Sequence, residues 1–306
     1  MTTLGDREPT KAHSGYLGAE VTKAPDWHGL VTLDLLLNNL TTGLFLAAAV
    51  GELARPALIG PVARLAYPIA LVALLADLLC LVVDLGNPTR FHHMLRVFKP
   101  TSPMSLGVWS LTAYSLPLTL VVAIDLLGWL GLLPSSGGVG LARGAILALG
   151  LLPAFGSAIY KGVLFSTSSQ PGWKDARWLG AYLVSSALMY GAGGLYALAI
   201  LAGLEAAGPL RWAFAALVAT NLVPLGLLAA GLHPALARVH HRGGLYRLGA
   251  LAAGVGVLGP LALVLASGGE PAAWAALGGL VLGGLAWRHA IVMLPHGAPH
   301  GAGSPG

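Results

Sequence analysis

Polar side chains that could do chemistry are few in this sequence, and they interrupt long apolar runs. Asp34 and Asn38 lie four residues apart. Asp77 and Asp84 lie seven apart, and Tyr160 stands near the end of another apolar run. Residues four or seven apart share one face of a helix. Ionisable groups inside apolar segments are costly, which makes them functional candidates. The alternative is that these groups pair with one another and only stabilise helix contacts.

This set of side chains suits the binding of a quinone at the edge of an apolar helix bundle. The two carbonyls of a quinone need hydrogen-bond partners, its oxidation and reduction move protons, and its isoprenoid tail needs an opening to lipid. By depth, Asp34, Asp84 and Tyr160 lie toward the same membrane side. We therefore predict that Asp34, Asn38 and Tyr160 bind a quinone. Asp77 and Asp84 are predicted to transfer protons.

The composition indicates which elements must position these residues. The chain has 306 residues, of which 56% are hydrophobic and 9% charged, and its mean hydropathy is +0.76. A soluble domain carries about 25% charged residues, so most of this chain cannot face water. Apolar runs of about 18 residues or more predict membrane-spanning helices. We predict an all-α membrane protein with eight spans, over residues 28–51, 64–85, 105–133, 140–165, 177–203, 210–231, 245–266 and 272–294.

Basic residues at the span ends predict an orientation. An even number of spans places both termini on one side, together with the connection over residues 86–104. Most of the 17 Lys and Arg residues fall on that side, with Lys161 and Arg288 counted among them. The positive-inside rule therefore predicts that this side is cytoplasmic and that the protein lies in the cell membrane. The same rule accounts for the sequence pI of about 9.5, so no nucleic-acid partner is predicted.

Cysteine and histidine positions limit the cofactors that this chain could hold by itself. Cys80 is the one cysteine, which excludes an intrachain disulfide and a four-cysteine iron–sulfur site. A transmembrane haem needs two imidazoles at span depth on facing helices. The histidines considered stand instead at span ends or in connections: His28, His92, His93, His233, His240, His241 and His289. We predict no haem, no iron–sulfur cluster and no metal site in this chain.

Two longer motifs are recognisable. The first lies between the second and third spans and contains D-L-G-N-P-T-R-F-H-H, from Asp84, followed by F-K-P-T-S-P-M-S. The second begins Tyr160-Lys161-Gly162 and continues with Pro-Gly-Trp at residues 171–173. Both resemble the signature of the NrfD/PsrC family, which supplies membrane subunits of polysulfide-reductase-like complexes. The resemblance covers about residues 27–295 and is weaker in the last four spans.

The resemblance implies a division of the chain into two four-helix bundles. We place the first at residues 27–166 and the second at residues 167–294. A polar tail over residues 1–26 precedes them, and a flexible tail over residues 295–306 follows. The family's quinone site lies at the rim of the first bundle.

The resemblance also implies roles at that site. Menaquinone or ubiquinone would bind there as substrate, with Tyr160 donating a hydrogen bond to one carbonyl. The first-span polar position, often His in relatives, falls on Asp34. An ionised aspartate only accepts hydrogen bonds. Asp34 would therefore be protonated, act through water, or accept a proton from a quinol.

Partners are likewise implied by the resemblance. A ferredoxin-like iron–sulfur subunit would exchange electrons with the quinone, and a molybdopterin subunit would carry out the substrate chemistry. This chain would then be an oxidoreductase subunit without the catalytic centre. The residues predicted to dock the iron–sulfur subunit all lie in the 86–104 connection: Arg90, Phe91, His92, His93, Arg96, Lys99, Pro100, Thr101, Ser102 and Pro103.

Two other classes of function remain open from the sequence. In one, the chain is a passive membrane anchor for the catalytic pair, and electrons take another route. In the other, it is a secondary transporter, a class in which inverted repeats with broken helices meet at the midplane. The sequence shows no such symmetry, which makes the transporter the weaker alternative.

Overall fold

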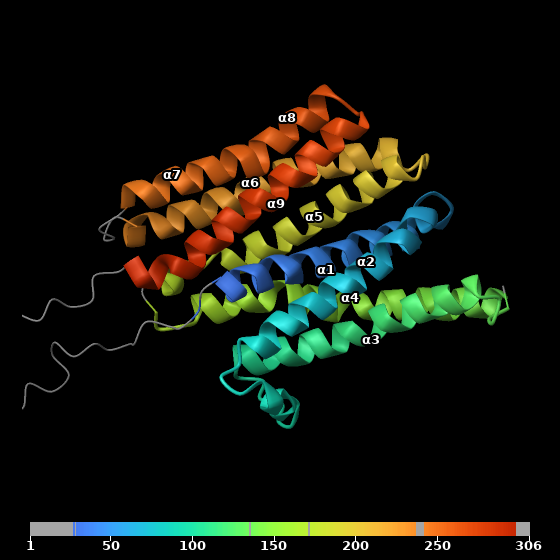
Figure 1. Ribbon diagram of the computed structural model, residues 1–306, viewed down its shortest axis with the longest axis horizontal. Helices are drawn as coiled ribbons and strands as arrows, with labels where there is room; N and C mark the ends of the chain where they lie inside the picture. Colours follow the sequence, from blue (N-terminus) through green and yellow to red (C-terminus); the bar gives the residue numbers. More distant parts are fainter. Residues whose placement is uncertain (1–26, 28, 135, 171, 237–241, 298–306) are drawn as a thin grey trace, which may run out of the picture.

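The protein is all-helical over the residues that the computed structural model describes, which are 27, 29–134, 136–170, 172–236 and 242–297 (Figure 1). The predicted N-terminal tail lies outside the described residues, as does most of the predicted C-terminal tail. The long helices are α1 (Gly29–Ala54), α2 (Pro56–Val83), α3 (Pro103–Trp129), α4 (Gly137–Ser166), α5 (Leu179–Leu201), α6 (Ala207–Leu236), α7 (Arg242–Ala253), α8 (Gly259–Ala266) and α9 (Glu270–Met293). Four short elements join or interrupt them: η1 (Pro88–Leu95), η2 (Trp173–Asp175), η3 (Gly254–Leu258) and η4 (Leu294–Gly297).

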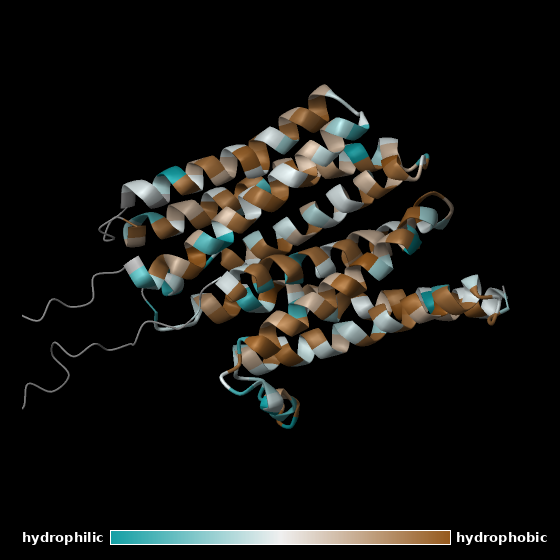
Figure 2. Cartoon of the chain, in the orientation of Figure 1, coloured by the Kyte–Doolittle hydropathy of each residue, from teal (hydrophilic) through white to brown (hydrophobic). Residues whose placement is uncertain are grey.

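Eight helical segments are long and apolar enough to cross a membrane, as the sequence predicts. Six of them are single helices. The seventh in chain order is built from α7, η3 and α8 over Tyr246–Ala266, and the eighth continues from α9 into η4 over Glu270–His296. Pro260 has no backbone N–H to continue the regular pattern, and a π turn takes up the difference, with Gly259 N–H bonded to Gly254 O. Apolar residues cover most of the length of the helices (Figure 2). The chain is an integral, multi-pass membrane protein.

One predicted boundary is wrong by two turns. The second span was placed at 64–85, but α2 begins at Pro56, directly after α1 ends. Pro56 occupies the first position of the helix, where its missing N–H has no partner to lose. Arg64 therefore lies eight residues inside the helix rather than at its start.

Helices α1 and α5 form the centre of the molecule. In the most apolar 18-residue stretch of each helix, 72% of the residues in α1 and 67% of those in α5 are buried. The corresponding shares in the other six spans are 22–44%. The two helices cross closely at Gly43 and Gly191, where an added Cβ on either residue would overlap the backbone of the other helix. Small residues permit such approaches in lipid. Because α1 contacts α2, α4, α5 and α9, the grouping into two four-helix bundles stays a prediction.

The connection between α2 and α3 projects from one end of the helices (Figure 1). It contains the short helix η1, which the sequence analysis did not predict. Ser102 caps α3 by accepting from the Ser105 backbone N–H, and Pro103 follows at the first helical position. Ser105 Oγ in turn accepts from the backbone N–H of Lys99 at 2.9 Å. The P-T-S-P-M-S motif thus fixes how the loop enters α3.

Candidate functional site

A buried lysine joins two carboxylates near the loop end of the molecule. Lys161 of α4 places its Nζ 2.7 Å from Asp34 Oδ1 of α1 and 3.2 Å from Asp77 Oδ1 of α2. The same ammonium donates to the backbone oxygen of Asp34 at 3.1 Å. All three residues are at least 95% buried. Two carboxylates share one cation, so the cluster carries a formal charge of −1 when every group is ionised.

Asn38 lies behind this cluster, one helical turn from Asp34. Its Nδ2 donates to Asp77 Oδ2 at 3.3 Å and to Ser157 Oγ at 3.1 Å. The amide therefore fixes the second oxygen of Asp77, whose first oxygen faces Lys161. Each Asp77 oxygen has a donor, which lowers the cost of burying an ionised group.

A cavity of about 250 Å³ opens beside the cluster. Asp34, Asp84, Tyr160 and Lys161 supply its polar wall. The rest of the wall is apolar and comes from α1, α2, α3, α4 and η1, with Trp27 beside the start of α1: Trp27, Leu30, Val31, Cys80, Leu81, Leu85, Met94, Met104, Leu164 and Phe165. The cavity thus combines an apolar lining with a few convergent polar groups, which is the usual character of a small-molecule site.

The Tyr160 ring packs against α3 because of a glycine. A Cβ at Gly107 would overlap the Tyr160 ring, so only glycine leaves room for the phenol at this depth. Two residues after Tyr160, Gly162 lies against the backbone of Gly180 in α5. These two contacts give a physical role to Gly107, which follows the P-T-S-P-M-S motif, and to Gly162, which belongs to the Tyr160-Lys161-Gly162 motif.

Trp173 fixes the connection between α4 and α5 to α9, next to the cavity wall. Its Nε1 donates to Ile291 O of α9 at 2.7 Å, and the residue is 2% exposed. Its ring packs against Trp27 and Phe165, with centroids 5.2 and 4.5 Å away. Since Trp27 and Phe165 both line the cavity, Trp173 stabilises the cavity wall from behind.

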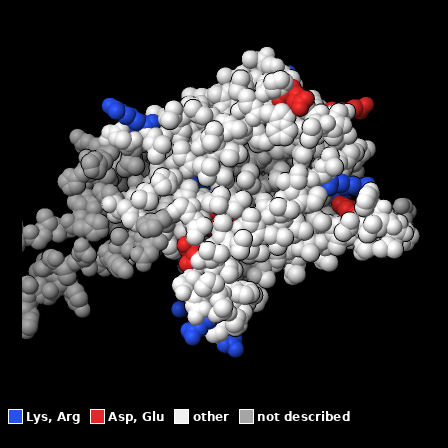
Figure 3. Space-filling model, in the orientation of Figure 1, with Lys and Arg blue, Asp and Glu red and all other residues white. Residues whose placement is uncertain are grey.

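Two methionines of the loop over residues 86–104 line the cavity, and most of the loop is exposed to solvent. Met94 of η1 and Met104 of α3 are part of the lining. Most of the residues predicted to dock a partner are exposed, including the three cations Arg90, Arg96 and Lys99. Basic side chains stand at the tip of this projecting loop in Figure 3. Exposed apolar side chains accompany them: Phe91, Leu95, Val97 and Phe98.

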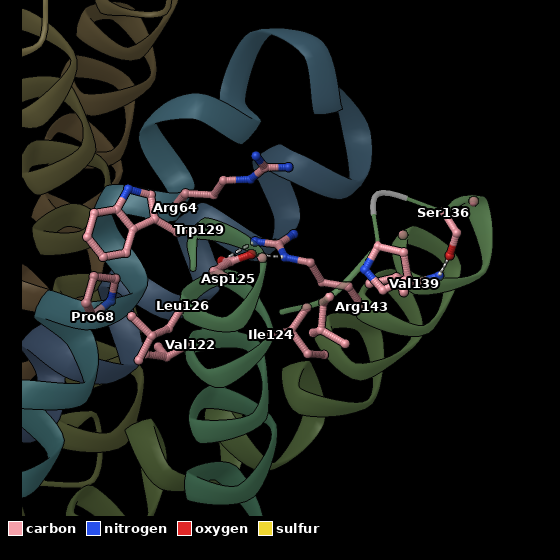
Figure 4. Close-up of a pocket in the computed structure, with 15 residues that line it drawn as sticks. Arg64, Pro68, Val122, Ile124, Asp125, Leu126, Trp129, Ser136, Val139 and Arg143 are labelled. Carbon is pink, nitrogen blue, oxygen red and sulfur yellow. Dashed lines mark hydrogen bonds and ion pairs between the residues drawn. The ribbon is translucent and has the colours of Figure 1, made fainter. Parts of the chain in front are cut away.

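A second charged cluster lies at the opposite end of α1 and α4. Arg143 of α4 donates from Nε and a terminal nitrogen to the two oxygens of Asp125 in α3, at 2.7 and 2.8 Å (Figure 4). Its other terminal nitrogen lies 2.6 Å from Glu52 Oε1 in α1. Glu52 Oε2 accepts from the Tyr67 hydroxyl at 2.8 Å. Every carboxylate oxygen in this cluster has a donor.

A third buried cation, Arg288 of α9, has only neutral partners among the described residues. It is 0% exposed. Its guanidinium donates to Leu35 O at 3.3 Å, Ser186 Oγ at 3.0 Å, the Tyr190 hydroxyl at 3.3 Å and Gly284 O at 3.1 Å. These bonds connect α9 with α1 and α5 across the centre of the molecule.

The structure places three of the predicted site residues at the cavity and two behind its wall. Asp34, Tyr160 and Asp84 meet at one cavity, although Asp84 follows the end of α2 and is exposed. Asn38 and Asp77 lie behind the lining. Among the described residues, no group of three or more His, Cys, Asp or Glu side chains is placed to hold a metal ion. His28, His240 and His241 lie outside the described residues.

The roles of three basic residues were not predicted from the sequence. Lys161 and Arg288 were counted among the basic residues on the side of the termini, and Arg143 is one of the few that the same count leaves on the opposite side. All three are buried inside the helices. A signal was available for Lys161 and Arg143, because each stands inside an apolar run that also has carboxylates at matching depth on neighbouring spans.

Fold and site together define a polytopic helical membrane subunit with a polar cavity beside a projecting loop. The family model described as polysulphide reductase, NrfD, matches residues 22–267. The chain belongs to the NrfD family, as its motifs predicted. Members are membrane subunits of polysulfide- and molybdoenzyme-type reductases, which generally pair with iron–sulfur and molybdenum subunits. No curated protein matches this chain in sequence.

Proposed function

We propose that this chain binds a membrane quinone in the cavity lined by Asp34, Tyr160 and Lys161. The proposal rests on three features that lie side by side: an apolar cavity of about 250 Å³, a buried group that can exchange protons, and a loop suited to a redox partner. A naphthoquinone or benzoquinone ring fits the apolar wall, and its carbonyls need the polar groups of the same cavity.

Lys161 resolves the difficulty that an ionised Asp34 cannot donate a hydrogen bond. The ammonium lines the cavity beside Asp34 and carries three donors. Tyr160 supplies a phenolic donor from the adjacent position. Tyr160 can therefore donate to one carbonyl without protonation of Asp34, and Lys161 can donate to the other if it exchanges its bond to the Asp34 backbone oxygen for one to the ligand.

The same cluster can accept a proton when a quinol is oxidised. Oxidation of one quinol releases two electrons and two protons. If Asp34 takes a proton, Lys161 keeps its ion pair with Asp77 and is not left as a buried unpaired charge. Asp84, exposed at the end of α2, is a second group that can exchange protons near the cavity mouth.

Electrons would leave or arrive through a ferredoxin-like iron–sulfur subunit docked on the 86–104 loop. The exposed cations and apolar side chains of this loop suit a partner with acidic and apolar patches. Met94 and Met104 bring the loop to the cavity wall. A molybdopterin subunit beyond it would carry the substrate site. We place this loop and the termini on the cytoplasmic side of the cell membrane, from the excess of basic residues there.

The test is a redox titration of the complex purified in mild detergent. A quinol analogue is added while the optical spectrum of the copurifying iron–sulfur clusters is followed. We expect quinol-dependent reduction of the clusters in the wild type and its loss in Asp34→Ala. Tyr114→Phe is the matched control, because Tyr114 is a fully buried tyrosine that contacts Thr41 and lies outside the cavity.

Two results would decide against the proposal. Cluster reduction that is unchanged in Asp34→Ala would remove this cavity from the electron route. Copurification of the partner subunits with no quinol-linked change in the wild type would leave the passive anchor as the better description.

A further inference from the structure

A second, larger cavity lies at the end of the molecule opposite the 86–104 loop. It has a volume of about 970 Å³ and opens between α2, α3 and the beginning of α4 (Figure 4). Its charged lining consists of Arg64, Asp125 and Arg143. The proposed quinone chemistry uses none of these residues.

Arg64 is the cation that the neighbouring cluster leaves available. Both oxygens of Asp125 accept from Arg143, and both oxygens of Glu52 have donors as well. Among the described residues Arg64 forms no ion pair or hydrogen bond. Figure 4 shows its guanidinium extending from α2, apart from the Asp125–Arg143 pair.

The depth of Arg64 places it near a lipid headgroup. Helix α2 has 28 residues and is about 42 Å long, whereas the hydrocarbon core is about 30 Å thick. Arg64 lies about 12 Å from the start of the helix, near the hydrocarbon boundary on that side. Its side chain is exposed, and a long cationic side chain at this depth extends toward phosphate groups.

An apolar groove leads from Arg64 toward the membrane centre. On α2, Pro68 lies one turn deeper than Arg64. On α3, Val122, Leu126 and Trp129 follow a spacing of four and three residues, so they form one stripe along the helix. Trp129 is 82% exposed at the end of α3, where a tryptophan suits the membrane interface.

We propose that this cavity binds an anionic phospholipid. Arg64 contacts the phosphate, and one acyl chain lies in the groove formed by Pro68, Val122 and Leu126. The ligand is a lipid rather than a free anion, because one cation faces the headgroup while the adjoining surface is apolar over two helical turns. The Glu52–Arg143–Asp125 cluster forms the floor of the site without taking part in the contact.

The test is lipid titration of the complex purified in mild detergent, followed by native mass spectrometry. Phosphatidylglycerol and phosphatidylcholine with identical acyl chains are compared. We expect phosphatidylglycerol to bind about fivefold more tightly, the effect of one basic residue near the membrane surface. The preference disappears in Arg64→Gln and persists in Arg55→Gln, a matched exposed arginine at the same end and outside this cavity.

Two further measurements complete the test. One uses a variant that keeps Arg64, and the other distinguishes a lipid from a free anion. Val122→Trp fills the groove and lowers the binding of both lipids while Arg64 remains. Inorganic phosphate at 10 mM, used as competitor on the order of a cellular concentration, leaves phosphatidylglycerol bound if the acyl chain contributes. Displacement by phosphate alone would assign the cavity to a free anion. A phosphatidylglycerol preference that survives in Arg64→Gln would reduce Arg64 to a counter-charge for Asp125 and overturn the proposal.

Discussion

The two ends of α1 and α4 carry the same arrangement of charges with different chemistry. At each end α1 supplies a carboxylate and α4 supplies a cation, and a third helix supplies the second carboxylate. At the loop end the cation is Lys161, and at the opposite end it is Arg143. Each cluster therefore holds two carboxylates around one cation inside the membrane.

The difference lies in the identity of the cation. Arg143 forms two parallel bonds to Asp125 and a third to Glu52, a rigid planar arrangement in which every carboxylate oxygen is satisfied. A guanidinium does not lose its proton in proteins. Lys161 is a compact ammonium with rotatable donors, placed in the wall of the 250 Å³ cavity. The comparison teaches that the Arg143 cluster fits a structural clamp, whereas Lys161 can turn one of its donors from the Asp34 backbone oxygen to a ligand in the cavity.

Arg143→Met is expected to have the largest effect on folding. It leaves the buried Glu52 and the partly exposed Asp125 without their shared cation, and breaking a buried ion pair costs about 3–5 kcal/mol. The measurement is the free energy of unfolding of the purified complex in a denaturing-detergent titration, with Arg55→Met as the exposed control. An unfolding curve that matches the wild type would show that this cluster is not a clamp.

Lys161→Arg tests whether the chemistry at the loop end depends on the ammonium. The charge is retained, so the complex is expected to assemble. The larger planar group displaces the donors in the cavity, and a misplacement of about 1 Å can lower a rate on the order of a hundredfold. Quinol-linked cluster reduction is measured by stopped-flow absorbance. The reciprocal variant Arg143→Lys should lower stability and leave this rate unchanged; a loss of rate in both variants would contradict the division of roles.

Arg288→Met extends the comparison to a buried cation whose described partners are neutral. No buried carboxylate is left behind, so the cost is expected to be smaller than for Arg143→Met. The loss comes from the charge-assisted hydrogen bonds that the guanidinium donates to oxygens such as Leu35 O and Ser186 Oγ, at about 2 kcal/mol. The same unfolding titration measures it. A cost above that of Arg143→Met would mean that Arg288 also balances the charge of the Lys161 cluster.

Tyr160→Phe is expected to have the smallest effect. It removes one donor from the cavity wall and keeps the ring that packs against Gly107. One hydrogen bond of about 1 kcal/mol corresponds to about a fivefold weaker apparent affinity for the quinol analogue. Steady-state titration of the analogue gives this value. An unchanged affinity in an assembled complex would remove the Tyr160 hydroxyl from the site.

Much of the fold could be predicted from the sequence. Eight apolar runs of sufficient length give eight spans because lipid leaves the backbone no alternative to helix. Asp34, Asp84 and Tyr160 could be placed at one membrane end by counting residues along each span, and the structure brings them to one cavity. The motifs around Asp84 and Tyr160 indicated the family, which the family match confirms.

The start of α2 and the helix η1 could not be predicted in the same way. The second span was placed at 64–85, after Pro56 and Pro61, yet a proline near a helix start loses little, because the first N–H groups have no helical partner. In η1 the pattern of polar and apolar residues is too short to distinguish a short helix from an irregular loop. These are local choices that the surrounding structure decides.

By itself, the sequence determined the span count, the polar residues at each depth and the motifs of the loop. The tertiary structure alone decided which charges are paired. Lys161, Arg143 and Arg288 each stand near a span end, where a long side chain can turn outward to headgroups or inward to a carboxylate. Spacing along one helix does not distinguish these directions, because the partners Asp34, Glu52 and Leu35 O come from another helix more than 90 residues away in the chain. The contacts with α1 make these three basic residues, which stand near span ends, the centres of the buried polar network.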